Sequence, residues 1–362
     1  MKIGLGLYRH MLTPENLAFA RQAGATHIVA HLVDYFRGVP DSGTDNQPTG
    51  GDSGWGMAGD PDCLWSLEEL LWLRRQVEDA GLELEAIENF DPAHWHDVLL
   101  DGPRKSEQLE NLKTLVRRVG EAGIPIIGYN FSLAGVCGRV TGPFARGEAV
   151  SVGMDGPLDA PMPRGMVWNM VYAPDAGGDV VPPISHEELW RRLEGFLEAL
   201  LPVAEEAGVK LAAHPDDPPM PTMRQQPRLV FQPHLYQRLI DLNPSPSNML
   251  EFCVGTLGEM TEGDLYEAVD SYSRQDRLAY VHLRNVTGKV PYYRETFLDD
   301  GDIDMIRVLR ILSDNGYTGV LIPDHTPLMS CPGSWHAGMA YALGYVHAAI
   351  QAIQEGEPRN PL

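Results

Sequence analysis

Short apolar runs alternate with longer amphipathic segments along the chain, and this alternation repeats eight times. Each run spans four to eight residues with β-branched or aromatic side chains, which is the pattern of a strand buried on both faces. We expect these strands at Lys2–Leu7, His27–Leu32, Glu83–Glu88, Pro125–Phe131, Lys210–Pro215, Met249–Gly255, Leu278–Asn285 and Gly319–His325.

The segments between these strands carry helix start and stop signals. N-cap residues stand at Thr13, Ser66 and Ser185, and the glycines that end the same helices are Gly24, Gly81 and Gly208. Two more helices are expected over Asp302–Asn315 and Trp335–Ile353. Strict strand–helix alternation implies parallel strands with right-handed crossovers. We therefore predict an α/β fold, a single (β/α)8 TIM barrel over residues 1–354, with a C-terminal tail at 355–362.

Two connections are too long to be plain turns. Asp34–Leu64, after the second strand, is rich in Gly, Asp and Ser, and Ser132–Pro183, after the fourth, carries repeated Gly and Pro. Both follow the carboxyl ends of strands, which is the face where barrel enzymes build their active sites. We expect lids or substrate walls there, with a disordered insertion as the alternative.

Composition narrows the possible partners. The 28 Lys+Arg and 50 Asp+Glu residues give a formal net charge of −22, which argues against binding to nucleic acid or to an anionic membrane surface. No stretch approaches the roughly 18 apolar residues of a membrane span, and the N-terminus does not read as a signal peptide. The four cysteines are widely spaced and form no CxxC pair, so we expect reduced thiols and a cytoplasmic protein.

Four consecutive predicted strands end on a side chain that can bind a metal, namely His214, Cys253, His282 and Asp324. Neighbouring strand ends of a barrel converge on one mouth, so these residues can meet although a whole strand–helix unit separates each pair. One histidine at a strand end is more often a hydrogen-bonded core residue, and a buried cysteine is usually a small hydrophobe. Four at successive strand ends favour a shared metal site.

The mixed donor set limits the choice of metal. Two imidazoles, a thiolate and a carboxylate suit Mn²⁺, Fe²⁺, Co²⁺ or Zn²⁺ better than Mg²⁺ or Ca²⁺, which prefer oxygen ligands. Thiolate softness favours Zn²⁺, but softness alone does not name the metal. A dinucleotide cofactor is not expected, because GLGLYR at Gly4–Arg9 is not a GxGxxG fingerprint, and a serine hydrolase would need a nucleophile elbow that we do not find.

The strings around these residues resemble the signature segments of mannonate dehydratases, a family of xylose-isomerase-like barrels. The matching strings are HPDDPP at His214–Pro219, CVGTLG at Cys253–Gly258, HLRNV at His282–Val286, PDH at Pro323–His325, YNF at Tyr129–Phe131, Glu88 with His94, and LDDGDIDM at Leu298–Met305. The resemblance covers most of the chain and is strongest from about Lys210 onward. It implies a Mn²⁺-dependent conversion of D-mannonate into 2-keto-3-deoxy-D-gluconate and water, and a homo-oligomer.

The resemblance also implies roles for single residues. The family's metal ligands fall on His214, Cys253, His282 and Asp324, the four residues that the strand ends indicate independently. The histidine matching His325 is held to be catalytic in the family, and here it fits proton transfer, with orientation of a ligand as the alternative.

Substrate contacts are expected from residues beside the ligands. Arg284 lies two residues beyond His282 and so on the same strand face; it can clamp a carboxylate, or form a salt bridge instead. Further candidates for substrate binding are Tyr129, Asn130, Asp216, Asp217, Glu88 and His94. For Asp216 and Asp217 a solvated turn is nearly as good an explanation.

Three features depart from the family pattern. Met339 stands where family members carry a tyrosine thought to share in proton transfer, and Tyr341 faces about 200° away on a helix. The N-terminal GLYRHMLTPEN and the connection after the fourth strand also differ. These departures leave open a dehydratase for a related aldonate, a divalent-metal sugar isomerase or epimerase, and a non-catalytic sugar-acid-binding protein. Sugar isomerases and epimerases usually bind their metal with a carboxylate-rich ligand set. The thiol of Cys253 therefore argues against the isomerase or epimerase alternative.

Overall fold

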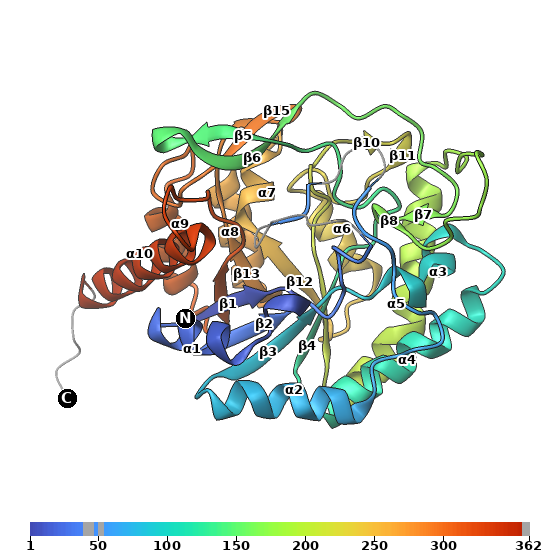
Figure 1. The fold of residues 1–362 in the computed structure, drawn as a ribbon, viewed down its shortest axis with the longest axis horizontal. Coiled ribbons are helices and arrows are strands. Elements are labelled where there is room, and N and C mark those ends of the chain that lie inside the picture. Colours follow the sequence, from blue (N-terminus) through green and yellow to red (C-terminus); the bar gives the residue numbers. More distant parts are fainter. Residues whose placement is uncertain (39–46, 50–53, 357–362) are drawn as a thin grey trace.

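The computed structural model describes residues 1–38, 47–49 and 54–356, and its centre is a closed barrel of parallel strands (Figure 1). Around the barrel the order is β1 (Lys2–Leu7), β16 (Val320–Pro323), β13 (Leu278–Leu283), β12 (Asn248–Cys253), β9 (Lys210–Ala213), β4 (Ile126–Tyr129), β3 (Glu83–Glu88) and β2 (His27–Ala30). The predicted (β/α)8 barrel is thus confirmed. Six of these strands end two residues earlier than predicted, because the chain leaves the sheet just where the site begins.

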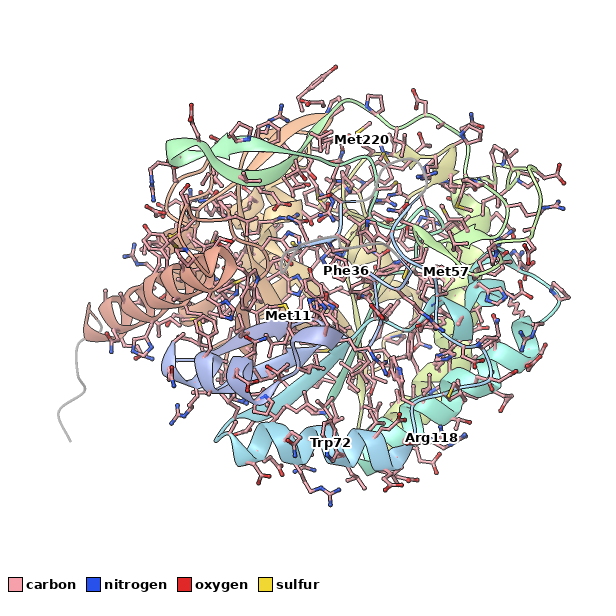
Figure 2. All side chains as sticks on the ribbon, viewed as in Figure 1. Met11, Phe36, Met57, Trp72, Arg118 and Met220 are labelled. Atoms are coloured by element: carbon pink, nitrogen blue, oxygen red, sulfur yellow. The ribbon has the colours of Figure 1, made fainter. Side chains whose placement is uncertain are left out.

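Helices surround the barrel and supply its outer core. They are α1 (Pro14–Gln22), α2 (Leu67–Asp79), α3 (His96–Leu100), α4 (Lys105–Glu121), α5 (His186–Ala207), α6 (Leu235–Leu242), α7 (Val254–Glu259), α8 (Leu265–Arg274), α9 (Met305–Asp314) and α10 (Ser334–Gly356). Strand side chains that point outward pack on these helices in one large hydrophobic cluster. The outer faces of the helices are exposed to solvent; Trp72, for example, lies exposed on the outer side of α2 (Figure 2).

The predicted caps form as expected. The Thr13 hydroxyl accepts a hydrogen bond from the Asn16 amide (3.3 Å), and Ser66 and Glu69 make a complete capping box. Ser185 caps α5, which ends at Gly208 with φ of 68°. Helices α3, α4, α6, α7 and α8 were not predicted individually.

Side chains that point into the barrel are small or branched, and they form a separate inner cluster of Val29, Ala86, Ile126, Ala212, Met249, Ala279, Tyr280, Val320 and Ile322. Successive side chains of a strand alternate between its two faces. The residues two positions after Val29, Ala212, Tyr280 and Ile322 therefore also point inward, now at the mouth of the barrel. This alternation selects which strand-end residues reach the site.

The long connection after β4 forms a wall over the mouth. It contains β5 (Val140–Ala145), β6 (Ala149–Asp155), β7 (Met166–Val167) and β8 (Met170–Val171). Strands β5 and β6 join β15 (Tyr292–Thr296) and β14 (Asn285–Lys289) in an antiparallel sheet of order β14-β15-β6-β5, at the top of Figure 1. For this segment the disordered alternative is wrong. A small hairpin of β10 (Thr222–Met223) and β11 (Gln226–Pro227) lies nearby.

Parts of two predictions fall outside the described residues. Positions 39–46 and 50–53 of the first long connection are among them, as are residues 357–362 of the predicted tail. Helix α10 continues to Gly356, so the first two residues of that tail are helical. Among the described residues, no helix has the length and apolarity needed to cross a bilayer.

A close backbone contact holds the wall in place. Trp168 and Asn169 adopt φ of 53° and 56°, a left-handed conformation that is unusual for non-glycine residues. Gly135, itself at φ of 63°, lies against them so closely that a Cβ there would come 2.5 Å from the Trp168 carbonyl carbon. The wall can approach this point only because residue 135 has no side chain.

This contact predicts a difference between two glycine substitutions. Gly135→Ala should lower the free energy of unfolding by about 2–4 kcal/mol, from left-handed strain plus displaced backbone. Gly147→Ala is the matched control, because Gly147 has φ of 69° but nothing within 4 Å of its Cβ position; its loss should be about 1–2 kcal/mol from strain alone. Denaturant unfolding measures both, and equal losses would contradict the packing described.

Candidate active site

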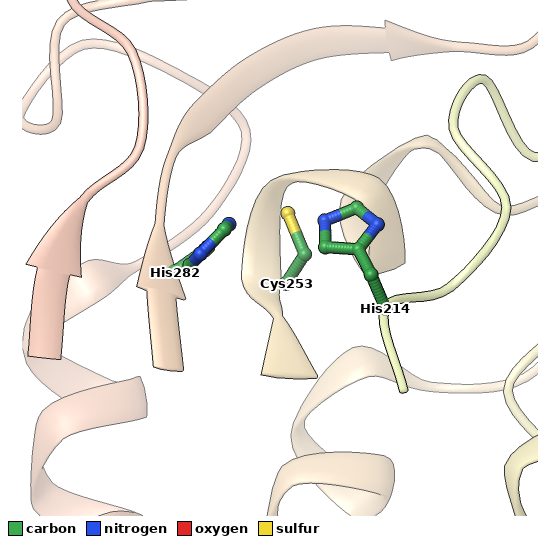
Figure 3. A group of neighbouring side chains, drawn as sticks. All are labelled: His214, Cys253 and His282. Atoms are coloured by element: carbon green, nitrogen blue, oxygen red, sulfur yellow. The ribbon is translucent and has the colours of Figure 1, made fainter. Parts of the chain in front are cut away.

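Four metal-capable side chains meet at the mouth of the barrel, as predicted. His214 follows β9, Cys253 ends β12, His282 lies in β13, and Asp324 follows β16. His214, His282 and Asp324 each come two residues after a member of the inner cluster, so strand alternation turns them inward. Figure 3 shows His214, Cys253 and His282 pointing toward one another from three adjacent strand ends.

The distances between these groups fit a single ion. His282 Nδ1 lies 3.4 Å from Asp324 Oδ1, and Cys253 Sγ lies 3.8 Å from Asp324 Oδ2. Ligand atoms of His214, Cys253 and His282 lie within 4.8 Å of one another. Ligands bonded to one ion at about 2.0–2.3 Å in a tetrahedron would be about 3.3–3.8 Å apart. His214, Cys253 and His282 therefore need only small adjustments to hold a divalent transition ion, and Asp324, which contacts two of them but lies outside this three-residue group, would have to move toward His214 to join them.

The electrostatics also suit a cation. Both ring nitrogens of His282 are buried without a hydrogen-bond partner among the described residues. Burial raises the pKa of the Cys253 thiol, but the Arg284 guanidinium and contacts with His214 and His282 outweigh burial and bring that pKa to about 6. A thiolate is the form of cysteine that binds metals. The pKa of Asp324 is also lowered, because nearby cationic groups outweigh its burial.

Two further carboxylates lie beneath His282 inside the barrel. Its Nε2 is 3.3 Å from Glu88 Oε2 and 3.4 Å from Glu251 Oε1, and these three residues form a second group with metal-binding geometry. Burial and the neighbouring Glu88 carboxylate raise the pKa of Glu251 to about 8. We interpret this pair as the partner of His282 Nε2, which leaves Nδ1 facing Cys253 and Asp324. Sequence reasoning missed Glu251, which the alternation of β12 places two residues before Cys253.

Arg284 does not line the cavity, although we expected it to clamp a substrate carboxylate. Its guanidinium is 1% exposed and lies 2.8 Å from Asp217, 3.0 Å from Glu259, 3.2 Å from Asp324 and 3.4 Å from Glu295. Its two Nη atoms are committed to these four carboxylates, while its Nε is buried without a hydrogen-bond partner in the described part of the chain and the side chain is not part of the cavity lining. Its position therefore agrees with the alternative given above for Arg284, a salt bridge with neighbouring carboxylates.

A cavity of about 70 Å³ is lined by three of the four candidate ligands, His214, His282 and Asp324. Its lining contains several predicted site residues: Glu88, Asn130, Asp217, His214, His282, Asp324 and His325. Asn130 is held by the Trp168 indole N–H (3.1 Å) and donates to the Pro215 carbonyl (2.9 Å). Asp217 accepts from Arg284, whose charge brings the pKa of Asp217 to about 2 despite burial.

Three other predicted contacts do not reach this cavity. Tyr129 points outward and packs on Phe196, with ring centroids 5.1 Å apart, because it sits next to the inward-facing Asn130. Asp216 accepts hydrogen bonds from the Leu229 and Val230 amides and pairs with Arg228 at 3.2 Å. His94 lines a different cavity. These positions correct the expectation that Tyr129, Asp216 and His94 contact the same substrate.

Several residues of the lining were not predicted, among them His31, Arg139, Trp55 and Trp168. His31 comes two positions after the inner-cluster residue Val29, so alternation of β2 could have indicated it. Arg139, Trp55 and Trp168 come from the two long connections, where no periodic pattern marks an inward position. Among the described lining residues, Arg139 is the only Arg or Lys.

The barrel and its metal-capable mouth define the class, a (β/α)8 barrel with a candidate metal site at the carboxyl ends of its strands. Solved structures share this fold: L-ribulose 3-epimerase aligns with a TM-score of 0.57 at 14% identity over 100% of both chains. The model of the family D-mannonate dehydratase (UxuA) matches residues 1–140 and 179–360. The chain belongs to the mannonate dehydratase family.

Individual relatives agree with this assignment. Mannonate dehydratase from Streptococcus pneumoniae (strain 70585) is 35% identical over 277 residues, 72% of this chain and 74% of that protein. Mannonate dehydratase from Thermotoga maritima is 28% identical over 322 residues, 82% of this chain and 88% of that protein. The crystal structure of mannonate dehydratase from Streptococcus suis serotype 2 aligns with a TM-score of 0.76 at 27% identity, covering 100% of this chain and 96% of that one.

The geometry predicts that Cys253 is a metal ligand. Cys253→Ser should weaken Mn²⁺ binding at least ~10-fold, the lower bound for losing even an outer partner of a metal site. Cys63→Ser is the control, because Cys63 is exposed and lies outside this cavity. Titration of the metal-free protein measures both affinities, and unchanged binding by Cys253→Ser would remove the thiol from the ligand set.

Proposed function

We propose that this protein dehydrates D-mannonate to 2-keto-3-deoxy-D-gluconate, using a divalent ion held by His214, Cys253, His282 and Asp324. The observation that carries the proposal is the convergence of these four side chains beside His325, in a chain of the mannonate dehydratase family. The bound ion would supply positive charge that stabilises the anion developing next to the substrate carboxylate. We propose Mn²⁺ as that ion, with Fe²⁺, Co²⁺ or Zn²⁺ as alternatives that the same donors accept.

His325 is proposed to transfer the proton. It lines the cavity directly after Asp324, and its Nδ1 lies 3.3 Å from Glu295 Oε2. A carboxylate on one ring nitrogen orients the imidazole. The other, Nε2, lies 3.3 Å from Asp324 Oδ1 and is proposed to act on the substrate when Asp324 binds the ion. His325 can take the proton from the carbon beside the carboxylate and deliver it to the departing hydroxide, which balances the loss of water.

Arg139 is proposed to bind the substrate carboxylate, in place of Arg284. Its guanidinium is buried, and Gln47 and the Pro48 carbonyl accept hydrogen bonds from its two Nη atoms. These contacts use only part of its donor set and hold the guanidinium at the cavity wall. The substrate hydroxyls are proposed to contact Asn130, Asp217 and Glu88, either directly or through other side chains that these three residues hold in place.

Three general properties accompany the proposal. The four cysteines are free, which suits a reducing compartment, and we propose a cytoplasmic enzyme of glucuronate catabolism. Family membership supports the substrate class and a homo-oligomeric state. Met339 lines the cavity and, with the wall segment 141–178 that the family model leaves unmatched, favours a test against related aldonates as well.

The direct test is product formation. Protein stripped of metal and reloaded with Mn²⁺ should convert D-mannonate into a 2-keto-3-deoxy acid, and other aldonates more slowly. His325→Asn, prepared alongside, should bind the same amount of Mn²⁺ and form no product. Metal-loaded protein that is silent on every aldonate would refute the proposed function, whereas loss of metal in His325→Asn would place that histidine in the coordination shell.

A separate test concerns Arg139. A charge-assisted hydrogen bond contributes about 1.5–3 kcal/mol, so Arg139→Met should lower kcat/KM for mannonate by roughly 10- to 150-fold. Arg164→Met is the control, because Arg164 pairs with Asp179 on the surface. The variant should also lose the preference for an acid inhibitor over the uncharged alditol of the same configuration. A preserved preference would assign the carboxylate to another group.

A further inference from the structure

One imidazole of the cavity has no role in the account so far. His31 lines the same space as His325 but comes from the opposite side of β1, just after β2. Its ring lies against Tyr8, with centroids 4.9 Å apart, and against Tyr35 at 5.7 Å. The side chain is therefore fixed by packing at the wall of the cavity.

A chain of hydrogen bonds sets the direction of the protons on His31. The Asn89 amide nitrogen donates to the Tyr35 hydroxyl oxygen at 3.1 Å, and that oxygen lies 3.2 Å from His31 Nδ1. A hydroxyl has one proton and two acceptor lone pairs, so the Tyr35 oxygen can accept from Asn89 while its proton points at Nδ1, which is the arrangement considered below. Nδ1 is then the acceptor.

In that arrangement the other nitrogen carries the proton. Burial lowers the pKa of His31, so the ring is neutral at neutral pH and holds its one proton on Nε2. Glu88 Oε2 lies 3.7 Å from Nε2, too far for a hydrogen bond. On another side, Gly6 leaves room: a Cβ there would come 3.8 Å from Nε2. The Nε2–H group is a fixed donor at the cavity.

Asn89 can donate this hydrogen bond to Tyr35 because of its backbone conformation. It follows β3 with φ of 70°, a left-handed conformation that asparagine tolerates better than most residues. The turn separates its side chain from that of Glu88, which faces His282. The end of β3 thus supplies one group to the metal side of the cavity and one to His31.

We propose that His31 is a second catalytic residue, whose Nε2–H donates a hydrogen bond to the substrate hydroxyl that departs as water, and that Tyr35 and Asn89 are positioning residues that fix its tautomer. The inference rests on the proposed function. In the elimination the carbon–hydrogen and carbon–oxygen bonds break, and the proton taken by His325 completes the water molecule. His31 keeps its own proton and stabilises charge on the leaving oxygen.

The activity test compares two substitutions with different geometry. The amide nitrogen of glutamine can replace the Nε2–H of His31, whereas the shorter asparagine can replace only Nδ1. His31→Asn should lower kcat by about 10²-fold, the loss seen when one such donor is removed, and His31→Gln should keep most of the rate. Both should bind Mn²⁺ like the wild type. His10→Asn is the control, since His10 is exposed and outside the cavity.

Nitrogen NMR of the ¹⁵N-histidine-labelled, metal-free protein reads the tautomer without any substrate. His31 should be protonated at Nε2, and Tyr35→Phe should give a mixture of both tautomers with a kcat several-fold lower. Protonation at Nδ1 in the wild type, or equal rates for His31→Asn and His31→Gln, would overturn the proposal. If the wild-type protein fails to dehydrate mannonate, the proposed function fails, while the NMR result still decides the tautomer.

Discussion

A single buried guanidinium makes the acidic mouth of this barrel possible. Arg284 lies within 3.4 Å of Asp217, Glu259, Glu295 and Asp324, which come from four different segments around the site. Buried carboxylates without a partner are strongly destabilising, so Arg284 stabilises the loop after β9, helix α7, strand β15 and the end of β16 together, with His282 and His325 as further partners of Asp324 and Glu295. Arg284 thereby positions a candidate metal ligand and a cavity wall together.

The single positive charge of Arg284 does not neutralise the anionic side chains around it. Asp217, Glu295, Asp324, Glu88 and the Cys253 thiol have lowered pKa values and so are anionic, whereas the raised pKa values of Glu251 and Glu259 favour their protonated forms. The remaining negative charge accounts for a site built to hold a divalent ion. Above that ion the cavity presents cationic or hydrogen-donating groups, Arg139, His31 and His325, which suit an anionic polyhydroxy substrate.

The sequence was sufficient to predict the barrel and the four candidate ligands, because both depend on strand ends. Each candidate ligand lies at or near the end of an apolar run. The parallel strands of a barrel bring these ends together regardless of the structure of the intervening loops. Strict alternation of side chains between the two faces of each strand would have predicted more of the inward-facing residues. It places Asn130 inward and its neighbour Tyr129 outward, and it indicates His31 two residues after Val29.

Other features depend on contacts between distant segments and lie beyond such patterns. Arg284 has the inward alternation of β13, yet carboxylates from elsewhere in the chain hold it below the cavity. Arg139 and Trp168 belong to a segment without periodicity, and Trp168 reaches Asn130 only because Gly135 admits its backbone. The proposed chemistry depends above all on one ion held by four side chains. Anomalous diffraction from crystals loaded with Mn²⁺ tests it most directly: we predict one peak within bonding distance of His214, Cys253, His282 and Asp324, and a peak held by Glu88 and Glu251 without Cys253 would contradict the account.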